Sequence, residues 1–429
     1  MLTYRPTSMT TPRTRPTNHA APYDLLIRGA EVLDPSQGLH GARDVAFAWG
    51  RVAAVADPGT IDSDAARGVI EAAGMLVTPG LIDLHTHIYV GGSELVIPAD
   101  EVCSVSGCTT VVDAGTAGAN TMLGLRRLVQ TDLRTRAYAF VHISGIGLAG
   151  HPHGESRDLL YLDPELAARC VLSYRGFVLG VKVRQTANLV GENGLEPLRR
   201  AVRAAELAQA GIGDGDDAER VPVMVHYGSA PASLEELLAV LRPGDVVTHG
   251  YNGGTNGVLD ASGRVEAAAR AARERGIIWD VGHGRGSFSY AVARACAEQG
   301  FWPDTISTDL HSASVNAPVI DMPTTMSKFL SLGMSLPEVV ARSTNAPAAF
   351  INKALPPAAR EPLLGTLKPG APGDAAVLDL RRAGGAGGEH TFQDSLGVTW
   401  TGPDRLIPVH TILGGRPWGR PYPHPYLVP

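Results

Sequence analysis

Cysteine is scarce in this sequence, and long hydrophobic runs and a large excess of one charge sign are absent. The four cysteines are too few for a disulfide framework, and none falls in a C-x-x-C pair. No apolar stretch reaches the roughly 18–20 residues that a membrane-spanning helix needs. The formal net charge is −6 over 429 residues, which gives no reason to expect binding to nucleic acid or to an anionic membrane. We therefore expect a cytoplasmic protein with reduced thiols that binds neither nucleic acid nor a membrane.

Lysine is also scarce, and this makes one lysine informative. Only four of the 37 basic residues are lysine, yet Lys182 lies in the apolar run FVLGVKV. Burial disfavours the charged form of an amine unless a partner compensates it. The residues alone leave two solutions open. Lys182 either pairs with a buried carboxylate, or it reacts with CO2 to form a carbamate, whose two oxygens can bridge two cations.

Short apolar runs alternate with helical stretches from residue 80 onward. Amphipathic stretches such as 197–210 and 263–276 lie between several of these runs. Eight strand–helix units in series predict an α/β fold, namely a (β/α)8 TIM barrel. The eight apolar runs are residues 80–87, 108–115, 137–144, 176–184, 221–228, 245–252, 276–284 and 304–311.

The segments on either side of the barrel have the alternating pattern of short β-strands. We expect residues 23–79 and 355–429 to pair into one small β-sandwich domain, and the barrel to span residues 80–354. Residues 1–22 are rich in Thr, Pro and Arg and lack the apolar core of a secretory signal. We expect this segment to be a disordered leader.

Ionisable side chains recur at the predicted ends of the barrel strands, where the active sites of such barrels gather. His85 and His87, in LIDLHTH, are two positions apart and should share one strand face, which makes them a natural chelate for zinc or a similar divalent ion. Buried ionisable groups are costly without partners or a metal. The remaining strand ends carry Asp113, His142, Lys182, His226, His249, His283, Asp309 and His311.

This pattern resembles the amidohydrolase superfamily, whose binuclear members include dihydroorotases, hydantoinases, phosphotriesterases and ureases. The matching elements are TPGLIDLHTH, a lysine in the fourth strand, and His, His and Asp at the ends of the fifth, sixth and eighth strands. The segments GVKVR, GDVVTHGYNG, DVGHGRGSFSY, ISTDLHS and DMPTTMSKFLSLGMSLPEVV are similar to the deacetylase-like branch. That branch includes enzymes that cleave acetyl esters of hydroxy acids. D-aminoacylases are more distantly similar.

The resemblance implies a binuclear metal-dependent hydrolase that cleaves an amide or ester (N-acyl or O-acyl) bond of a small, carboxylate-bearing substrate. A carbamate on Lys182 and a hydroxide would bridge two divalent ions, and Asp309 would act as the general acid–base. The ligands suit Zn²⁺, with Mn²⁺, Co²⁺ and Fe²⁺ as alternatives. The implied ligands are His85, His87 and Asp309 for one ion, His226 and His249 for the other, and Lys182 for both.

Five further polar residues are expected to contact the substrate or to orient the ligands. Arg184 should share the strand face of Lys182, where its guanidinium would either clamp a substrate carboxylate or form a structural ion pair. The other four are His283, His311, Tyr227 and Asn252.

Two rival functions stay open from the sequence. One is a cyclic amide hydrolase of the dihydroorotase or hydantoinase type, because the sequence does not fix the shape of the pocket. The other is a non-catalytic barrel protein, although all six implied ligand positions are filled here. We also expect the chain to form a homo-oligomer.

Overall fold

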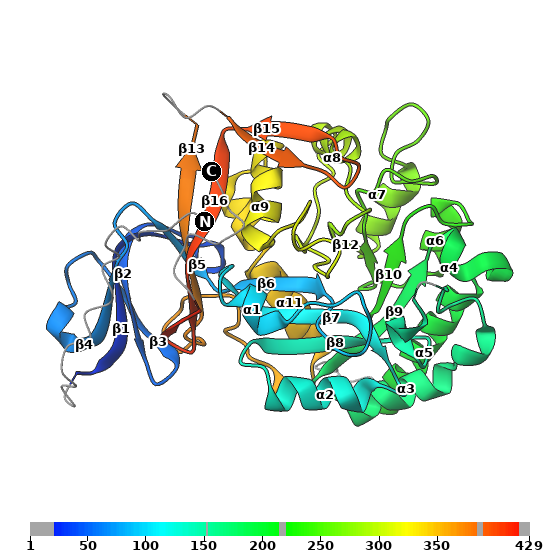
Figure 1. Ribbon diagram of the computed structural model, residues 1–429, viewed down its shortest axis with the longest axis horizontal. Coiled ribbons are helices and arrows are strands. Elements are labelled where there is room, and N and C mark those ends of the chain that lie inside the picture. The colour runs from blue at the N-terminus through cyan, green and yellow to red at the C-terminus, as the bar shows by residue number, and fades with distance from the viewer. Residues whose placement is uncertain (1–20, 152, 214–219, 384–388, 420–429) are drawn as a thin grey trace, which may run out of the picture.

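Two large sheets organise the computed structural model, a barrel and a smaller β unit beside it (Figure 1). The structure describes residues 21–151, 153–213, 220–383 and 389–419. The leader expected at residues 1–22 therefore lies, except for its last two residues, outside the described residues.

Seven parallel strands form the wall of the barrel, in the spatial order β12-β11-β10-β9-β8-β7-β6. Each strand pairs with its neighbour in sequence, as the predicted series of strand–helix units requires. Their bounds are β6 Leu81–Thr86, β7 Cys108–Gly118, β8 Arg136–His142, β9 Val178–Gln185, β10 Val223–Tyr227, β11 Val246–Thr248 and β12 Ile278–Trp279.

The eighth position of the barrel is occupied by residues 304–311, which do not form a regular strand. Isolated parallel bridges join Thr305 to Asp280 on one side and Leu310 to Thr86 on the other. The backbone amide of Asp309 also donates to the carbonyl of His85 at 2.7 Å. The predicted barrel is thus confirmed, but its last strand is irregular because Asp309 adopts a φ of 49°.

Apolar side chains separate into an inner and an outer layer along the barrel strands. The inner cluster fills the amino-terminal end of the barrel, where Phe140, Leu179 and Met224 pack against Phe350 and Ile351. The outer cluster lies under the surrounding helices. Because the apolar filling occupies the amino-terminal end, the polar side chains gather at the carboxyl ends of the strands.

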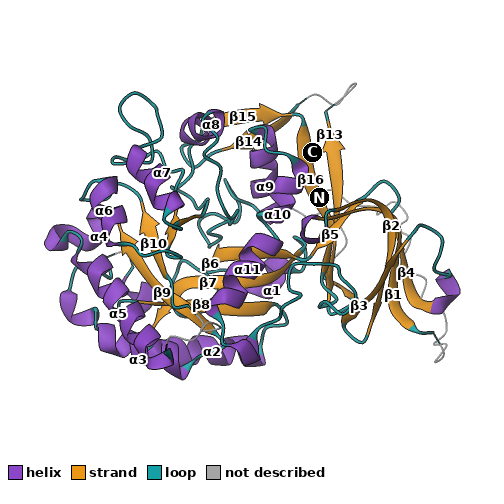
Figure 2. Ribbon diagram, turned by 180° about the vertical axis from the view of Figure 1, so that it is seen from behind, coloured by secondary structure: helices purple, strands orange, loops and turns teal. Residues whose placement is uncertain are grey.

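Helices cover the outside of the barrel and join its strands (Figure 2). Local signals set several of their ends: Ser233 and Glu236 form a reciprocal capping box at the start of α6. The predicted helix at 263–276 begins later than expected, because the Asp260 carboxylate accepts the amides of Ser262 and Arg264 and holds a turn there. The helices are α1 Ala99–Cys103, α2 Met122–Thr131, α3 Pro164–Ser173, α4 Ala187–Val190, α5 Glu196–Ile212, α6 Leu234–Val240, α7 Ala267–Glu274, α8 Tyr290–Glu298, α9 Met322–Ser331, α10 Leu336–Ala341 and α11 Asn345–Ala354.

The smaller unit is a mixed eight-stranded sheet that joins both ends of the described chain, as predicted for the β-sandwich. Its order is β17-β16-β13-β5-β1-β2-β3, and β4 also pairs with β1. A separate apolar cluster, which includes Ile27, Phe47 and Val377, forms its core. Its strands are β1 Tyr23–Asp34, β2 Leu39–Ala48, β3 Arg51–Ala56, β4 Ala66–Glu71, β5 Leu76–Pro79, β13 Ala375–Arg382, β16 Asp404–Leu413 and β17 Arg416–Trp418.

A hairpin between β13 and β16 leaves this sheet and reaches the barrel. Its strands are β14 (His390–Gln393) and β15 (Thr399–Gly402), which among the described strands pair only with each other. Figure 1 shows them lying beside α8 and α9. Ser395, in the turn of the hairpin, accepts the amide of Phe288 at 3.1 Å and donates to the carbonyl of Gly284 at 3.0 Å. The hairpin therefore braces the loop that follows β12.

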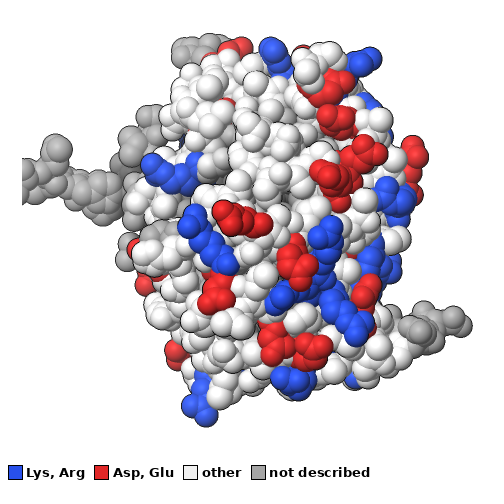
Figure 3. Space-filling model, turned by 90° about the vertical axis from the view of Figure 1, so that its right-hand side faces the viewer, with Lys and Arg blue, Asp and Glu red and all other residues white. Residues whose placement is uncertain are grey.

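Acidic and basic side chains are interspersed on the face shown in Figure 3. This distribution produces no extended field of one sign on that face. Within the described ranges, no helix is both long enough and apolar enough to cross a membrane.

Candidate metal centre

Three of the predicted ligands converge at the carboxyl end of the barrel. His85 and His87 come from the end of β6, and Asp309 comes from the eighth position. Asp309 Oδ1 lies 3.3 Å from His85 Nε2 and 3.2 Å from His87 Nε2. One donor atom from each residue lies within 4.8 Å of the other two. Two imidazoles and a carboxylate in this arrangement can hold a divalent ion.

A buried carboxylate behind His85 fixes which ring nitrogen faces the centre. His85 Nδ1 lies 2.8 Å from Thr248 Oγ1, and that hydroxyl donates to Asp280 Oδ2 at 2.7 Å. Because its proton is used on Asp280, Thr248 accepts from His85 Nδ1–H. His85 Nε2 therefore presents its lone pair to the centre, as a metal ligand must.

His226 and His249 form a second pair of imidazoles, whose ring centroids are 4.1 Å apart. His249 Nδ1 donates to the carbonyl of Gly282, so its Nε2 carries the lone pair. This Nε2 is buried and has no hydrogen-bond partner within the described chain. A buried acceptor of this kind, close to other imidazoles, fits a ligand of a metal ion.

Lys182 lies next to His85 and lines one cavity together with His226. Its Nζ is 3.2 Å from His85 Nε2, and the residue is 1% exposed. No carboxylate oxygen of a described residue forms an ion pair with Nζ. Burial lowers the pKa of Lys182 to about 7, against partial compensation by Asp309.

Asp309 is held ionised by its surroundings. Burial alone would raise the pKa of its carboxyl, but the neighbouring imidazoles, first of all His85, hold that pKa well below its usual value. Its backbone has a φ of 49°, and His249 has a φ of 67°. Such conformations are strained for residues other than glycine and cluster at functional sites.

A small cavity of about 50 Å³ opens onto these groups. Arg184, on the same strand as Lys182, lies on its wall, and so does His311. His311 Nδ1 accepts the amide of Ala313 at 3.2 Å, so the neutral ring carries its proton on Nε2. The lining residues are His87, Leu95, Leu148, Lys182, Arg184, His226, Asp309 and His311.

Comparison with curated proteins gives close relatives over most of the chain, although no family model matches it. It is 32% identical to a deacetylase of Enterococcus faecalis over 396 residues, which cover 92% of this chain and 98% of the relative. It is 38% identical to a deacetylase of Agrobacterium fabrum over 304 residues, which cover 70% and 71%. This chain belongs to the deacetylase-like branch of the amidohydrolase superfamily.

Solved structures agree with this membership. A crystal structure of an adenine deaminase matches with a TM-score of 0.80 and 32% identity, covering 93% of this chain and 100% of that one. A crystal structure of a dihydroorotase matches with a TM-score of 0.78 and 31% identity, covering 92% and 98%. This amidohydrolase is therefore a hydrolase that acts on small molecules, and its superfamily uses divalent metal ions at such a site.

The other three residues expected to contact the substrate or to orient the ligands make their contacts outside the small cavity in this amidohydrolase. His283 donates through Nδ1 to the carbonyl of Gly284, and its Nε2 accepts from Lys328 Nζ at 2.8 Å. The Asn252 amide donates to the carbonyls of Tyr227 and His249. Tyr227 packs in the outer apolar layer. None of the three lines the small cavity.

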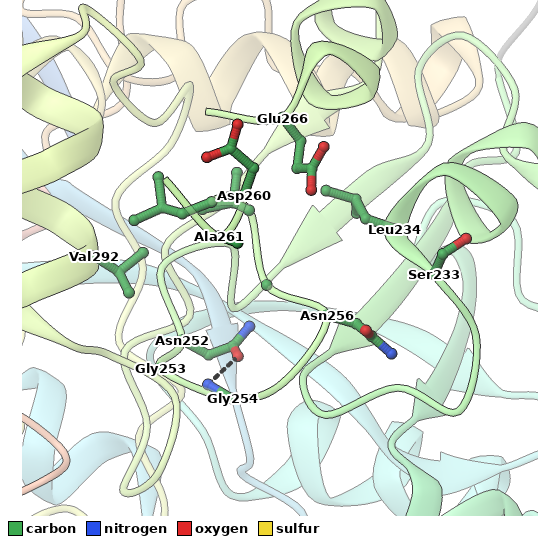
Figure 4. A pocket seen from close by; sticks show the side chains of 13 residues that line it. Ser233, Leu234, Asn252, Gly253, Gly254, Asn256, Asp260, Ala261, Glu266 and Val292 are labelled. Carbon is green, nitrogen blue, oxygen red and sulfur yellow. Dashed lines mark hydrogen bonds between the residues drawn. The ribbon is translucent and has the colours of Figure 1, made fainter. Parts of the chain in front are cut away.

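A larger hollow of about 340 Å³ lies behind Asn252, in the long loop between β11 and α7 (Figure 4). Asp260 and Glu266 border it, but Asp260 already accepts three hydrogen bonds from its own loop. The Asn252 carboxamide oxygen accepts the amide of Gly254. The hollow is separate from the convergent imidazoles, so the smaller cavity is the one that the chemistry of this amidohydrolase can use.

Sequence reasoning missed the residues that support the ligands. Asp280 accepts hydrogen bonds from Thr248, Thr305 and Ser307. An aspartate inside the apolar run IIWDVG was a readable signal for such a network, because a buried carboxylate needs donors. Thr248 carried no comparable signal.

Proposed function

We propose that this amidohydrolase is a deacylase with two divalent ions, which hydrolyses an N-acyl or O-acyl bond of a small carboxylate-bearing substrate. The observation that carries the proposal is the position of Lys182. Its amine lies 3.2 Å from His85 Nε2, the residue lines the same cavity as His226, and no described carboxylate pairs with it. A neutral amine is the form that reacts with CO2, and the resulting carbamate would supply the anionic bridge that the two histidine pairs lack.

The donors divide between two ions in this proposal. His85, His87 and Asp309 would hold one ion, and His226 and His249 the other. Imidazole and carboxylate donors suit Zn²⁺, with Mn²⁺, Co²⁺ and Fe²⁺ as alternatives. Ions bound there would lower the pKa of water towards about 7 and polarise the scissile carbonyl.

The chain's own residues then handle the proton and the substrate. Asp309 is ionised, and Oδ1 faces the histidine pair, so Oδ2 is the oxygen that would accept a proton from the attacking water. It would pass that proton to the leaving nitrogen or oxygen. Arg184 and the Nε2–H of His311 border the cavity, where they would bind the substrate carboxylate.

A cyclic amide hydrolase is the second candidate, because the dihydroorotase structure matches at 31% identity. A substrate panel separates the two. The purified enzyme should hydrolyse O-acetyl hydroxy acids or N-acetyl amino acids. Turnover of dihydroorotate or hydantoin, or release of ammonia from adenine, without any deacylation would overturn the deacylase proposal.

Metal analysis of a Lys182 variant tests the centre itself. We expect about two divalent ions per wild-type chain by inductively coupled plasma mass spectrometry. Lys182→Ala should lose most of this metal and its activity, and short carboxylic acids should restore part of both by replacing the carbamate. Full activity in Lys182→Ala would contradict the proposed bridge.

A further inference from the structure

Glu155 is a buried carboxylate next to the small cavity, and the proposed mechanism does not use it. The residue lies in the segment that follows β8 and is 2% exposed. Its Oε1 lies 3.3 Å from Arg184 NH1 and 3.5 Å from His142 Nε2. A charged group is rarely buried to this extent unless it is paired.

The backbone fixes the tautomer of His142, the second polar group that faces Glu155. His142 Nδ1 accepts the amide of Ser144 at 2.9 Å, so the neutral ring carries its proton on Nε2. This Nε2 faces Glu155 Oε1. Burial alone would raise the pKa of Glu155, but Arg184 and His142 hold that pKa at about 2. Glu155 is therefore a fixed anion rather than a group that titrates near neutrality.

Arg184 connects this anion to the cavity. In the ladder between β9 and β10, the backbone of Arg184 lies opposite that of His226. The Arg184 side chain is 16% exposed and lines the same cavity as Lys182 and Asp309. Among the described residues, Glu155 is the only carboxylate that pairs with its guanidinium. NH1 is used on this contact, so the other nitrogens of the fork remain for a ligand. A planar guanidinium binds a carboxylate well only when its orientation is fixed beforehand.

We propose that Glu155 is a positioning residue that aims the Arg184 guanidinium and thereby sets a preference for substrates that carry a carboxylate. The inference rests on the proposed function, because it assigns the carboxylate subsite of that same cavity. Glu155 also compensates the charge of Arg184 when the cavity holds no substrate, which a partly buried cation requires. The Nε2–H of His142 faces the same carboxylate at 3.5 Å and adds a second favourable contact to the anion.

A matched pair of substrates tests this role. N-acetylalanine and N-acetylalaninamide differ only in carboxylate against carboxamide. In Glu155→Gln we expect kcat/KM for the acid to fall by about 10-fold or more, mainly through KM, because the guanidinium is no longer held. The value for the amide should change by less than about threefold. An equal loss on both substrates would show a merely structural role and overturn the proposal.

A double-mutant cycle shows whether Glu155 acts through Arg184. Arg184→Met should lose the preference for the acid, and adding Glu155→Gln to it should cost nothing more on that substrate. The double variant removes both members of the ion pair and leaves no unpaired charge buried. It can therefore replace Glu155→Gln in the comparison with Arg184→Met if that single variant folds poorly. Metal content and thermal unfolding are compared for every variant. Additive losses in the double variant would contradict the proposal.

Ligand binding separates this inference from the proposed function. Calorimetry with lactate and lactamide, on the enzyme as purified with its metals, does not need turnover. Wild type should bind lactate at least about 10-fold more tightly than lactamide, and Glu155→Gln should abolish that difference. If the panel shows no deacylation but this difference holds, the proposed function fails and the carboxylate subsite stands. If wild type binds both equally, or binds neither, the subsite is overturned.

Discussion

Individual glycines shape the space around the candidate ligands. Gly284 has a φ of +52°, and a Cβ built there would overlap Asp309 Oδ2. Gly115 has a φ of +87°, and its Cβ would lie 2.7 Å from the Cβ of Lys182. Both positions therefore need glycine for two reasons, backbone conformation and close approach. Together they let Asp309 and Lys182 reach the centre of the barrel.

Gly284→Ala should inactivate the enzyme without unfolding it. The new methyl group displaces Asp309, and a misplacement of about 1 Å in such a group costs about 100-fold in rate. The strained conformation should cost a further 1–2 kcal/mol of stability, roughly. Steady-state kinetics and thermal unfolding measure the two effects. Gly286→Ala is the matched control from the same loop, since a Cβ there meets nothing within 4 Å. Equal activity of the two variants would contradict this account of Gly284.

The hydroxyl of Thr248 orients one ligand from outside the ligand set. Thr248→Val keeps the size of the side chain but removes the hydroxyl that links His85 Nδ1 to Asp280. Losses of about 10–100-fold in metal affinity are typical when such an orienting group is removed. Competition with a chelator measures this affinity. Thr305→Val is the control, because Thr305 also donates to Asp280 but is not the hydroxyl that contacts His85. The same loss in both variants would show that Asp280, rather than the orientation of His85, is responsible.

At the scale of elements, a second buried lysine joins a helix to the hairpin that braces the barrel. Lys328 is on α9, and its ammonium donates to the carbonyls of Pro318 and Gln393 and to His283 Nε2. These three acceptors match the three protons of an ammonium group. Gln393 ends β14, so Lys328 connects the hairpin to the loop after β12. The arrangement turns His283 towards α9 rather than towards the cavity.

Lys328 should give the stability of the protein a characteristic pH dependence. Burial lowers its pKa from 10.5 to about 7. Between these values the unfolded chain holds more protons than the folded one, so the free energy of unfolding should rise with pH, by at most about 1.4 kcal/mol per unit. Lys328→Met should show a smaller rise than the wild type. Urea unfolding at pH 7, 8 and 9 measures it, with Lys353→Met as an exposed control. Parallel curves for wild type and Lys328→Met would contradict the lowered pKa.

At the scale of the whole molecule, the architecture could be predicted from the sequence. The spacing of apolar residues within each strand or helix, and the order of these elements along the chain, are both visible in short stretches of sequence. Eight apolar runs in series indicated the barrel, and the spacing of His85 and His87 indicated a shared site. The structure brings Lys182, His226 and Asp309 to the same cavity. The irregular eighth strand was not foreseen, since its apolar pattern is normal and only its backbone is strained.

Contacts between distant loops were beyond such reasoning. Glu155 and Arg184 are in contact because the loop after β8 folds over the end of β9. The periodicity of apolar residues predicts strands and helices but not the path of such a loop. The hairpin at 390–402 was not predicted as a separate unit, because residues 355–429 were assigned as a whole to the β-sandwich. His283 and Asn252 have polar side chains at strand ends, yet their hydrogen bonds direct them to backbone groups and Lys328.

The irregular eighth position has a thermodynamic consequence for the barrel. The Asp309 amide closes the ring by donating to the carbonyl of His85, and the side chains of the same two residues are candidate ligands for one ion. An ion held there would be a cross-link between the first and last strands of the barrel, which are far apart in the sequence. Cross-links that close long loops restrict the unfolded chain most. Metal affinity and global stability would then be two measures of one free energy.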